Sequence, residues 1–154
     1  RPRSHRCGWI KNTDRSRSLI FEQRSTIDYI GAVQGIPVCF DAKECVAETF
    51  PLQNIHEHQV EFMKNFEKQQ GIAFILIYYS SRNILYYMRF EELYKFWMRA
   101  QNGGRKSFRF DELDERFFMK FFRGCYVPYL DALNLDLELR DELDKTGETA
   151  YNAK

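Results

Sequence analysis

One apolar run constrains the fold of this chain more than any other feature. Gly71–Tyr79 is almost continuously apolar, a pattern that is typical of a central strand buried on both faces of a sheet. The run is far too short to span a membrane. The sequence therefore predicts a layered domain in which a sheet is covered on both sides.

Strand-like and helix-like segments surround this run. Thr26–Val33 and Ile36–Lys43 predict a hairpin that turns at Gln34-Gly35. The other predicted elements follow in chain order: a helix over Gln53–Gln70, a strand over Asn83–Met88, a helix over Phe90–Ala100, a helix over Asp111–Phe122 with Asp111 as its N-cap, and a last strand within Tyr126–Leu137. This order predicts an α/β (α+β) fold with helices around a mixed sheet.

The chain has 154 residues, the length of one domain, and its two ends differ in charge. Residues 1–24 form a basic arm with seven cations and two acids, and residues 140–154 form an acidic tail that we expect to fray. The net charge of +1 therefore hides a basic segment that suits a nucleic-acid partner. The four cysteines lack a paired framework and no secretory signal opens the chain, so we predict a reducing, cytoplasmic location away from membranes.

Two carboxylates and a lysine gather on the predicted hairpin. Strand alternation puts Asp41 and Lys43 on one face of the second strand, and the turn brings Asp28 alongside Asp41. This set suits metal-assisted phosphodiester hydrolysis, with carboxylates to hold Mg²⁺ or Mn²⁺ and a lysine to orient water and offset developing charge. One such pattern alone is weak, and it equally describes a hairpin whose charged groups only face water.

Gln59 adds a polar amide to the apolar stripe of the next predicted helix. A buried amide needs hydrogen-bond partners, which an active-site carboxylate, a metal-bound water or the backbone would provide. Further along, the basic loop with Arg105, Lys106 and Arg109 is either a phosphate contact or a solvated loop. A zinc set of Cys39, Cys45, His56 and His58 is disfavoured because their spacing lacks the usual short pairs.

Five stretches of the sequence carry a resemblance to a known family: Ser25–Gly31, Phe40–Glu44, Phe50–Gln59, Phe90–Lys106 and Asp111–Leu113. In this order they resemble the RecU Holliday-junction resolvases of Gram-positive bacteria and mollicutes, which belong to the restriction-endonuclease-like nuclease superfamily. The resemblance covers most of the chain, from about Phe21 to Leu133. It implies a restriction-endonuclease-like mixed sheet, with residues 25–139 as the nuclease domain.

The resemblance also implies a function and a set of site residues. The function is that of a Mg²⁺- or Mn²⁺-dependent endonuclease that resolves four-way DNA junctions in recombination and repair. The implied catalytic residues are Asp28, Asp41, Lys43 and Gln59, with Lys43 as transition-state stabiliser, and the implied metal ligands are Thr26, Asp28, Asp41 and Gln59.

The implied partners are junction DNA and a second copy of the chain. In such homodimers a protruding stalk enters the junction centre, and its end corresponds to Phe21-Glu22-Gln23 in this sequence. The expected DNA contacts are Phe21, Arg24, Arg105, Lys106 and Arg109. Branch-migration and recombinase proteins are further expected partners.

The chain departs from the family pattern in three respects, one of which is that Ile27 and Ile30 stand where the more polar Thr and Asn are expected. Asp41 stands where members usually have Glu, which draws the carboxylate back by about 1.5 Å, one C–C bond. Residues 1–18 do not resemble the N-terminal helix and first strand of the family, which suggests a truncated or degenerate member or a non-native start. These departures leave an alternative open, a catalytically impaired junction-binding accessory protein. A restriction-type nuclease is disfavoured because no base-reading element is visible.

Overall fold

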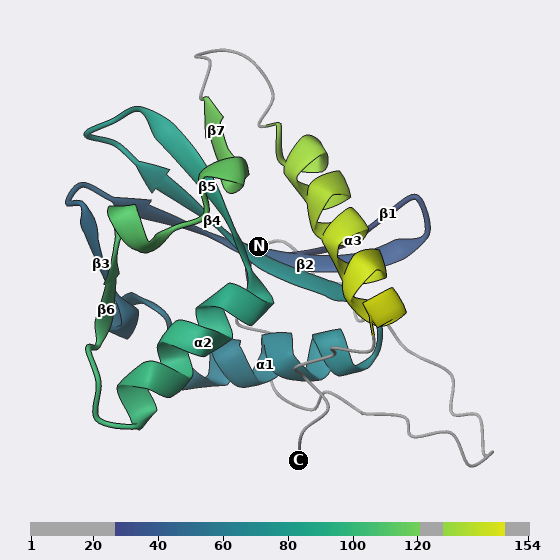
Figure 1. Cartoon of the computed structure of the whole chain (residues 1–154), viewed down its shortest axis with the longest axis horizontal. Helices are drawn as coiled ribbons and strands as arrows, with labels where there is room; N and C mark the ends of the chain where they lie inside the picture. Colours follow the sequence, from purple (N-terminus) through teal and green to yellow (C-terminus); the bar gives the residue numbers. More distant parts are fainter. Residues whose placement is uncertain (1–26, 121–127, 147–154) are drawn as a thin grey trace, which may run out of the picture.

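A computed structural model describes residues 27–120 and 128–146 of the chain (Figure 1). A mixed five-stranded sheet with the order β1-β2-β4-β5-β7 forms its centre. The strands of this sheet are β1 (Tyr29–Val33), β2 (Ile36–Cys45), β4 (Ile72–Tyr79), β5 (Ile84–Arg89) and β7 (Phe118–Lys120). A second, two-stranded sheet consists of β3 (Thr49–Pro51) and β6 (Ser107–Arg109).

Helices cover both faces of the central sheet. They are α1 (Glu57–Lys68), α2 (Phe90–Gln101) and α3 (Tyr129–Thr146), with short 3₁₀ turns η1 (Leu52–Asn54), η2 (Phe110–Glu112) and η3 (Glu115–Phe117). Figure 1 shows α1 and α2 on one side of the sheet and α3 on the other. The two-sided layering confirms the predicted α/β architecture. In the described part of the chain no helix has both the length and the apolar character needed to cross a bilayer.

The predicted hairpin is confirmed, and its turn sets the register of the site. Gln34 and Gly35 both have positive φ angles, 50° and 84°, which is the conformation of a two-residue hairpin turn. The antiparallel register pairs Tyr29 with Phe40. One step further along the ladder, this register brings Asp28 opposite Asp41.

Strand β2 sends alternate side chains to the two layers. Phe40 packs toward α3, where its ring lies 5.7 Å from that of Tyr129. Asp41 points the other way and bonds Gln59 of α1. Next to β2, the parallel strand β4 is buried along nearly its whole length, as its apolar run predicts. The polar site therefore lies between the sheet and α1.

Two sequence predictions in the C-terminal half are wrong. Asp111–Phe122 does not form one helix, because Phe117 and Met119 bury their side chains against the core and Phe118–Lys120 pairs with β5 as strand β7. Within the range Tyr126–Leu137, the described residues from Pro128 onward contain no strand. From Tyr129 the chain forms α3, which continues past the expected fraying point to Thr146.

The start of α1 also differs from the expected position. The sequence pattern predicts a helix from Gln53, but α1 begins at Glu57. Leu52–Asn54 forms the separate turn η1, and both Ile55 and His56 have extended backbone. This late start places Gln59 in the first turn of the helix.

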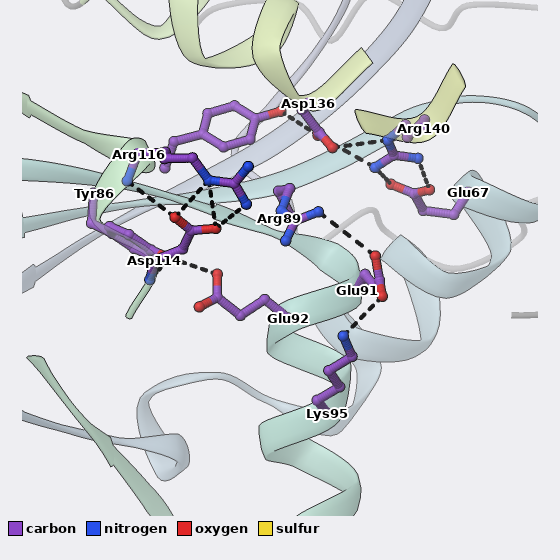
Figure 2. Close-up of polar contacts among 11 residues, drawn as sticks. Glu67, Tyr86, Arg89, Glu91, Glu92, Lys95, Asp114, Arg116, Asp136 and Arg140 are labelled. Carbon is purple, nitrogen blue, oxygen red and sulfur yellow. Dashed lines mark hydrogen bonds and ion pairs between the residues drawn. The ribbon is translucent and has the colours of Figure 1, made fainter. Parts of the chain in front are cut away.

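A partly buried ion network connects α3 to the rest of the fold, as Figure 2 shows. Arg140 donates to both carboxylate oxygens of Glu67 on α1, at 2.6 and 3.0 Å, and to Asp136 at 3.0 Å. The Tyr87 hydroxyl donates to Asp136 at 2.9 Å, and the Ala73 amide donates to Glu67 at 2.7 Å. The network therefore joins α1, β4, β5 and α3.

Candidate active site

Asp41 is the buried centre of the candidate site. Its side chain is 1% exposed, yet both carboxylate oxygens have partners. Oδ2 accepts a hydrogen bond from Gln59 Nε2 at 2.7 Å and lies 2.8 Å from Lys43 Nζ. Oδ1 accepts from the Ala42 amide at 3.1 Å. This arrangement holds a charged carboxylate inside the protein without leaving it unpaired.

Asp28 places a second carboxyl group beside Asp41. A hydrogen bond with Asp41 and repulsion from its charge raise the pKa of Asp28 above its ordinary value. Burial alone would raise the pKa of Asp41 too, but hydrogen bonds from Asp28, Lys43 and Gln59 outweigh it and leave that pKa lowered. The two carboxyl groups therefore influence each other, and their pKa values move in opposite directions.

The oxygen donors at this position fit a hard divalent cation. Asp28 is exposed and Lys43 is 22% exposed, so the site opens to solvent next to the buried Asp41. Asp28 and Asp41 would hold such a cation through their carboxylate oxygens. Mg²⁺ is commonly held by one or two carboxylates while water and substrate phosphates complete its coordination. Among the residues that the structure describes, no group of three or more His, Cys, Asp and Glu side chains gathers as a metal site.

The geometry of Gln59 follows from its place at the start of α1. The backbone N–H of His56, the residue before the helix, donates to Gln59 Oε1 at 3.0 Å. The nitrogen of the same amide, Nε2, donates to Asp41. From the residues alone, a carboxylate and the backbone were alternative partners, and the structure brings Gln59 to both. The His-x-x-Gln spacing, which matches that of a capping box, is the sequence signal for this contact.

The basic residues of the loop that leads into β6, and Arg109 at the end of that strand, are largely paired with nearby acids. Arg105 lies 3.2 Å from Glu112, and Arg109 lies 2.9 Å from Asp111. Arg99 also bonds Glu112, at 2.6 Å. Sequence reasoning missed Glu112, although its place only a few residues after the basic loop was a signal. The loop is joined to the site region because the Leu52 amide, just ahead of α1, donates to the Lys106 carbonyl at 3.1 Å.

Three of the sequence-predicted site residues lie outside the described residues. They are the expected ligand Thr26 and the expected DNA contacts Phe21 and Arg24. The aromatic residues of the α2 and η3 regions pack in the core, with Phe117 fully buried and Phe96 stacked on Phe108 at 4.8 Å. Asp28, Asp41, Lys43 and Gln59 are the predicted residues that the fold brings together.

Comparison with known proteins gives the family of this chain. The model of the family "RecU: Recombination protein U" matches residues 9–135. The Holliday junction resolvase RecU of Pediococcus pentosaceus is 38% identical over 124 residues, covering 79% of this chain and 62% of the relative. The protein of the same name from Bacillus subtilis is 40% identical over 120 residues, 77% of this chain and 56% of the relative. This chain thus spans little more than half the length of these relatives. The family match and these identities show that the chain belongs to the RecU family.

Proposed function

We propose that this chain is a divalent-metal-dependent endonuclease that cuts four-way DNA junctions. One observation carries the proposal: the buried Asp41 carboxylate is held between Lys43 and Gln59 with Asp28 beside it. Membership of the RecU family, whose relatives are named Holliday junction resolvases, supports the substrate.

In this proposal the site residues have distinct roles. Asp28 and Asp41 would hold Mg²⁺ or Mn²⁺ through their carboxylate oxygens. A divalent cation bound there supplies Lewis-acid polarisation of a phosphate oxygen and makes a water molecule more acidic. Lys43 Nζ lies 2.8 Å from Asp41 Oδ2, where the lysine would orient the attacking water and offset negative charge that develops on the phosphate.

The basic loop is proposed to contact the DNA backbone without reading bases. Phosphate contacts position a protein on DNA and carry no direct sequence information. Arg105 and Arg109 would exchange a carboxylate partner for a phosphate, and Lys106 forms no ion pair within the described residues. Two copies of the chain, acting as a homodimer, would place one site on each of two opposed strands.

Cleavage of a synthetic four-way junction tests this function directly. Purified protein is incubated with labelled junction or with linear duplex of the same arm sequence, in Mg²⁺, in Mn²⁺ or in EDTA. We expect nicking of the junction in the presence of metal, little cutting of the duplex, and no cutting in EDTA. Junction binding without nicking in either metal would instead indicate a non-catalytic junction-binding protein. Equal cutting of the duplex would contradict structure selectivity.

A further inference from the structure

The carboxylate of Glu112 joins the basic loop to the helix α2 that precedes it. We propose that Glu112 competes with DNA phosphate: it fixes Arg99 to the fold, occupies Arg105, and so weakens the binding of the loop to the DNA backbone. This competition rests on the proposed contact between the loop and DNA. It gives two neighbouring arginines different roles, one structural and one in binding.

Three donors converge on the Glu112 carboxylate. Arg99 Nη1 donates to Oε1 at 2.6 Å, and Arg105 Nη1 donates to Oε2 at 3.2 Å. The backbone N–H of Arg109 also donates to Oε2, at 2.7 Å. The bond from Arg99, together with that from the Arg109 N–H, holds the pKa of Glu112 below its ordinary value, so this carboxylate is charged at neutral pH. Guanidinium groups bind carboxylates and phosphates alike, so the two anions compete for the same donors.

Arg99 is fixed by several contacts besides Glu112. Its Nη2 donates to the Ser107 carbonyl at 2.6 Å, and its guanidinium lies over the Phe96 ring, 4.9 Å from the centroid. The Gly104 N–H donates to the Arg99 carbonyl at 2.9 Å, and a Cβ at Gly104 would lie only 2.7 Å from that oxygen. Arg99 thus connects α2 to both ends of the loop, and a phosphate would have to break these contacts to take it.

Arg105 is the arginine that a phosphate can detach. Its bond to Glu112 is the longest of the three, and its side chain is 53% exposed, against 34% for Arg99. Exposed ion pairs of this kind contribute little to stability, so breaking one costs little. The cost is still paid when Arg105 turns to a phosphate, and Glu112 then remains beside a second negative charge. Both effects lower the affinity of the loop for DNA.

A matched pair of substitutions separates this competition from a general change of charge. Glu112→Gln removes the charge that occupies Arg105, and Glu91→Gln removes one at the opposite end of α2. Glu91 lies 2.9 Å from Lys95, and its side chain is 30% exposed, against 28% for Glu112. Each substitution therefore takes one negative charge from an ion pair of similar exposure, and only one of them faces the loop.

Fluorescence anisotropy measures the binding of labelled linear duplex and of a labelled four-way junction in EDTA, which keeps the DNA intact. Glu112→Gln should bind both DNAs about threefold more tightly than the wild type, and Glu91→Gln should bind them as the wild type does. The gain should shrink as potassium chloride is added, because salt screens the ion pair between Glu112 and Arg105. Affinity of Glu112→Gln that is equal to or weaker than that of the wild type would overturn the proposal.

A double-mutant cycle shows whether Glu112 acts through Arg105. Arg105→Met removes the cation for which the two anions compete. In the Arg105→Met background, Glu112→Gln should therefore leave the DNA affinity nearly unchanged. An equal gain in both backgrounds would show that Glu112 acts only as a distant charge, and this result would refute its competition for Arg105.

Two other variants decide the question if thermal melting shows that Glu112→Gln does not fold. Lys106 forms no ion pair within the described residues, so it has no carboxylate to leave when it meets a phosphate. Lys106→Met should therefore weaken DNA binding about threefold more than Arg105→Met does, and a larger loss from Arg105→Met would overturn the proposal. A wild type that binds the junction without cutting it would refute the nuclease function and leave these comparisons valid. If neither the wild type nor Glu112→Gln binds DNA, the competition is wrong.

Discussion

Replacing Arg140 with methionine should destabilise the protein strongly, because the arginine is the only cation in the network that joins α3 to α1 in the described chain. Arg140 bonds Glu67 at 2.6 and 3.0 Å and Asp136 at 3.0 Å. Without it, two carboxylates remain that are largely out of water, since Asp136 is 1% exposed and Glu67 is 11% exposed. Breaking a buried ion pair from one side costs about 3 to 5 kcal/mol of unfolding free energy.

Urea denaturation followed by circular dichroism measures this loss. Arg82→Met is the matched control, because Arg82 pairs with Glu48 at the surface, where both side chains are well exposed. Surface pairs of this kind contribute up to about 1 kcal/mol. Adding Glu67→Gln to Arg140→Met should restore part of the stability, because it removes one of the two unpaired charges and keeps the acceptor for the Ala73 amide.

If Arg140→Met lowers the unfolding free energy no more than Arg82→Met, the Arg140 ion network does not hold α3 in place. A double variant no more stable than Arg140→Met would show that the unpaired Glu67 charge is not the source of the loss.

Three further predictions concern the site, one partly buried acid and the hairpin turn. Lys43→Met should lower the rate of junction cleavage by at least about a hundredfold while gel-shift binding of the junction is retained; wild-type cleavage would exclude the role given to this lysine. Burial raises the pKa of Glu92 above its ordinary value of 4.5, so the folded protein binds this proton more tightly than the unfolded chain and its unfolding free energy falls as pH rises from 4.5 through the raised pKa. Glu92→Gln keeps the acceptor for the Tyr86 hydroxyl and should remove this part of the pH dependence in urea titrations; an unchanged pH profile would argue against it. Gln34→Asn should stabilise the protein by about 0.5 kcal/mol in the same assay, because Asn tolerates the positive φ of 50° better than Gln, and a loss of stability would contradict the assigned turn.

The elements that sequence predicts well are those fixed by local chemistry. Gln34-Gly35 suits a two-residue turn independently of tertiary contacts. This turn sets the register of β1 and β2. The apolar run Gly71–Tyr79 likewise has few alternatives to a buried strand. The predicted gathering of Asp28, Asp41 and Lys43 follows from the same hairpin and from strand alternation.

The elements that sequence misassigns depend on distant partners. The polar residues of α3 bind partners that lie far away in the chain. Asp136 accepts a hydrogen bond from Tyr87, and Arg140 bonds Glu67, which is 73 residues away. No local pattern contains that information. In the same way, the edge of β5 draws Phe118–Lys120 into a strand, although the aromatic spacing around it suggests a helix.

The hydrogen bonds and ion pairs of the site could not be predicted from local sequence either. Helical spacing places Gln59 on the face toward the sheet, but it does not say which end of the amide meets Asp41. In the structure the amide nitrogen donates to Asp41, and the amide oxygen accepts from the backbone N–H of His56, the residue before α1. The pairing of Arg99 and Arg105 with Glu112 also depends on how the loop folds back.

The most direct test of the proposed site compares two carboxylates on the same strand. Asp41→Ala removes the buried carboxylate that meets Lys43 and Gln59, whereas Glu44→Ala removes an exposed one on the opposite face of β2. In Mg²⁺, Asp41→Ala should bind a synthetic four-way junction and leave it uncut, while Glu44→Ala should cut it at the wild-type rate. Cleavage by Asp41→Ala at the wild-type rate would contradict the assignment of the active site.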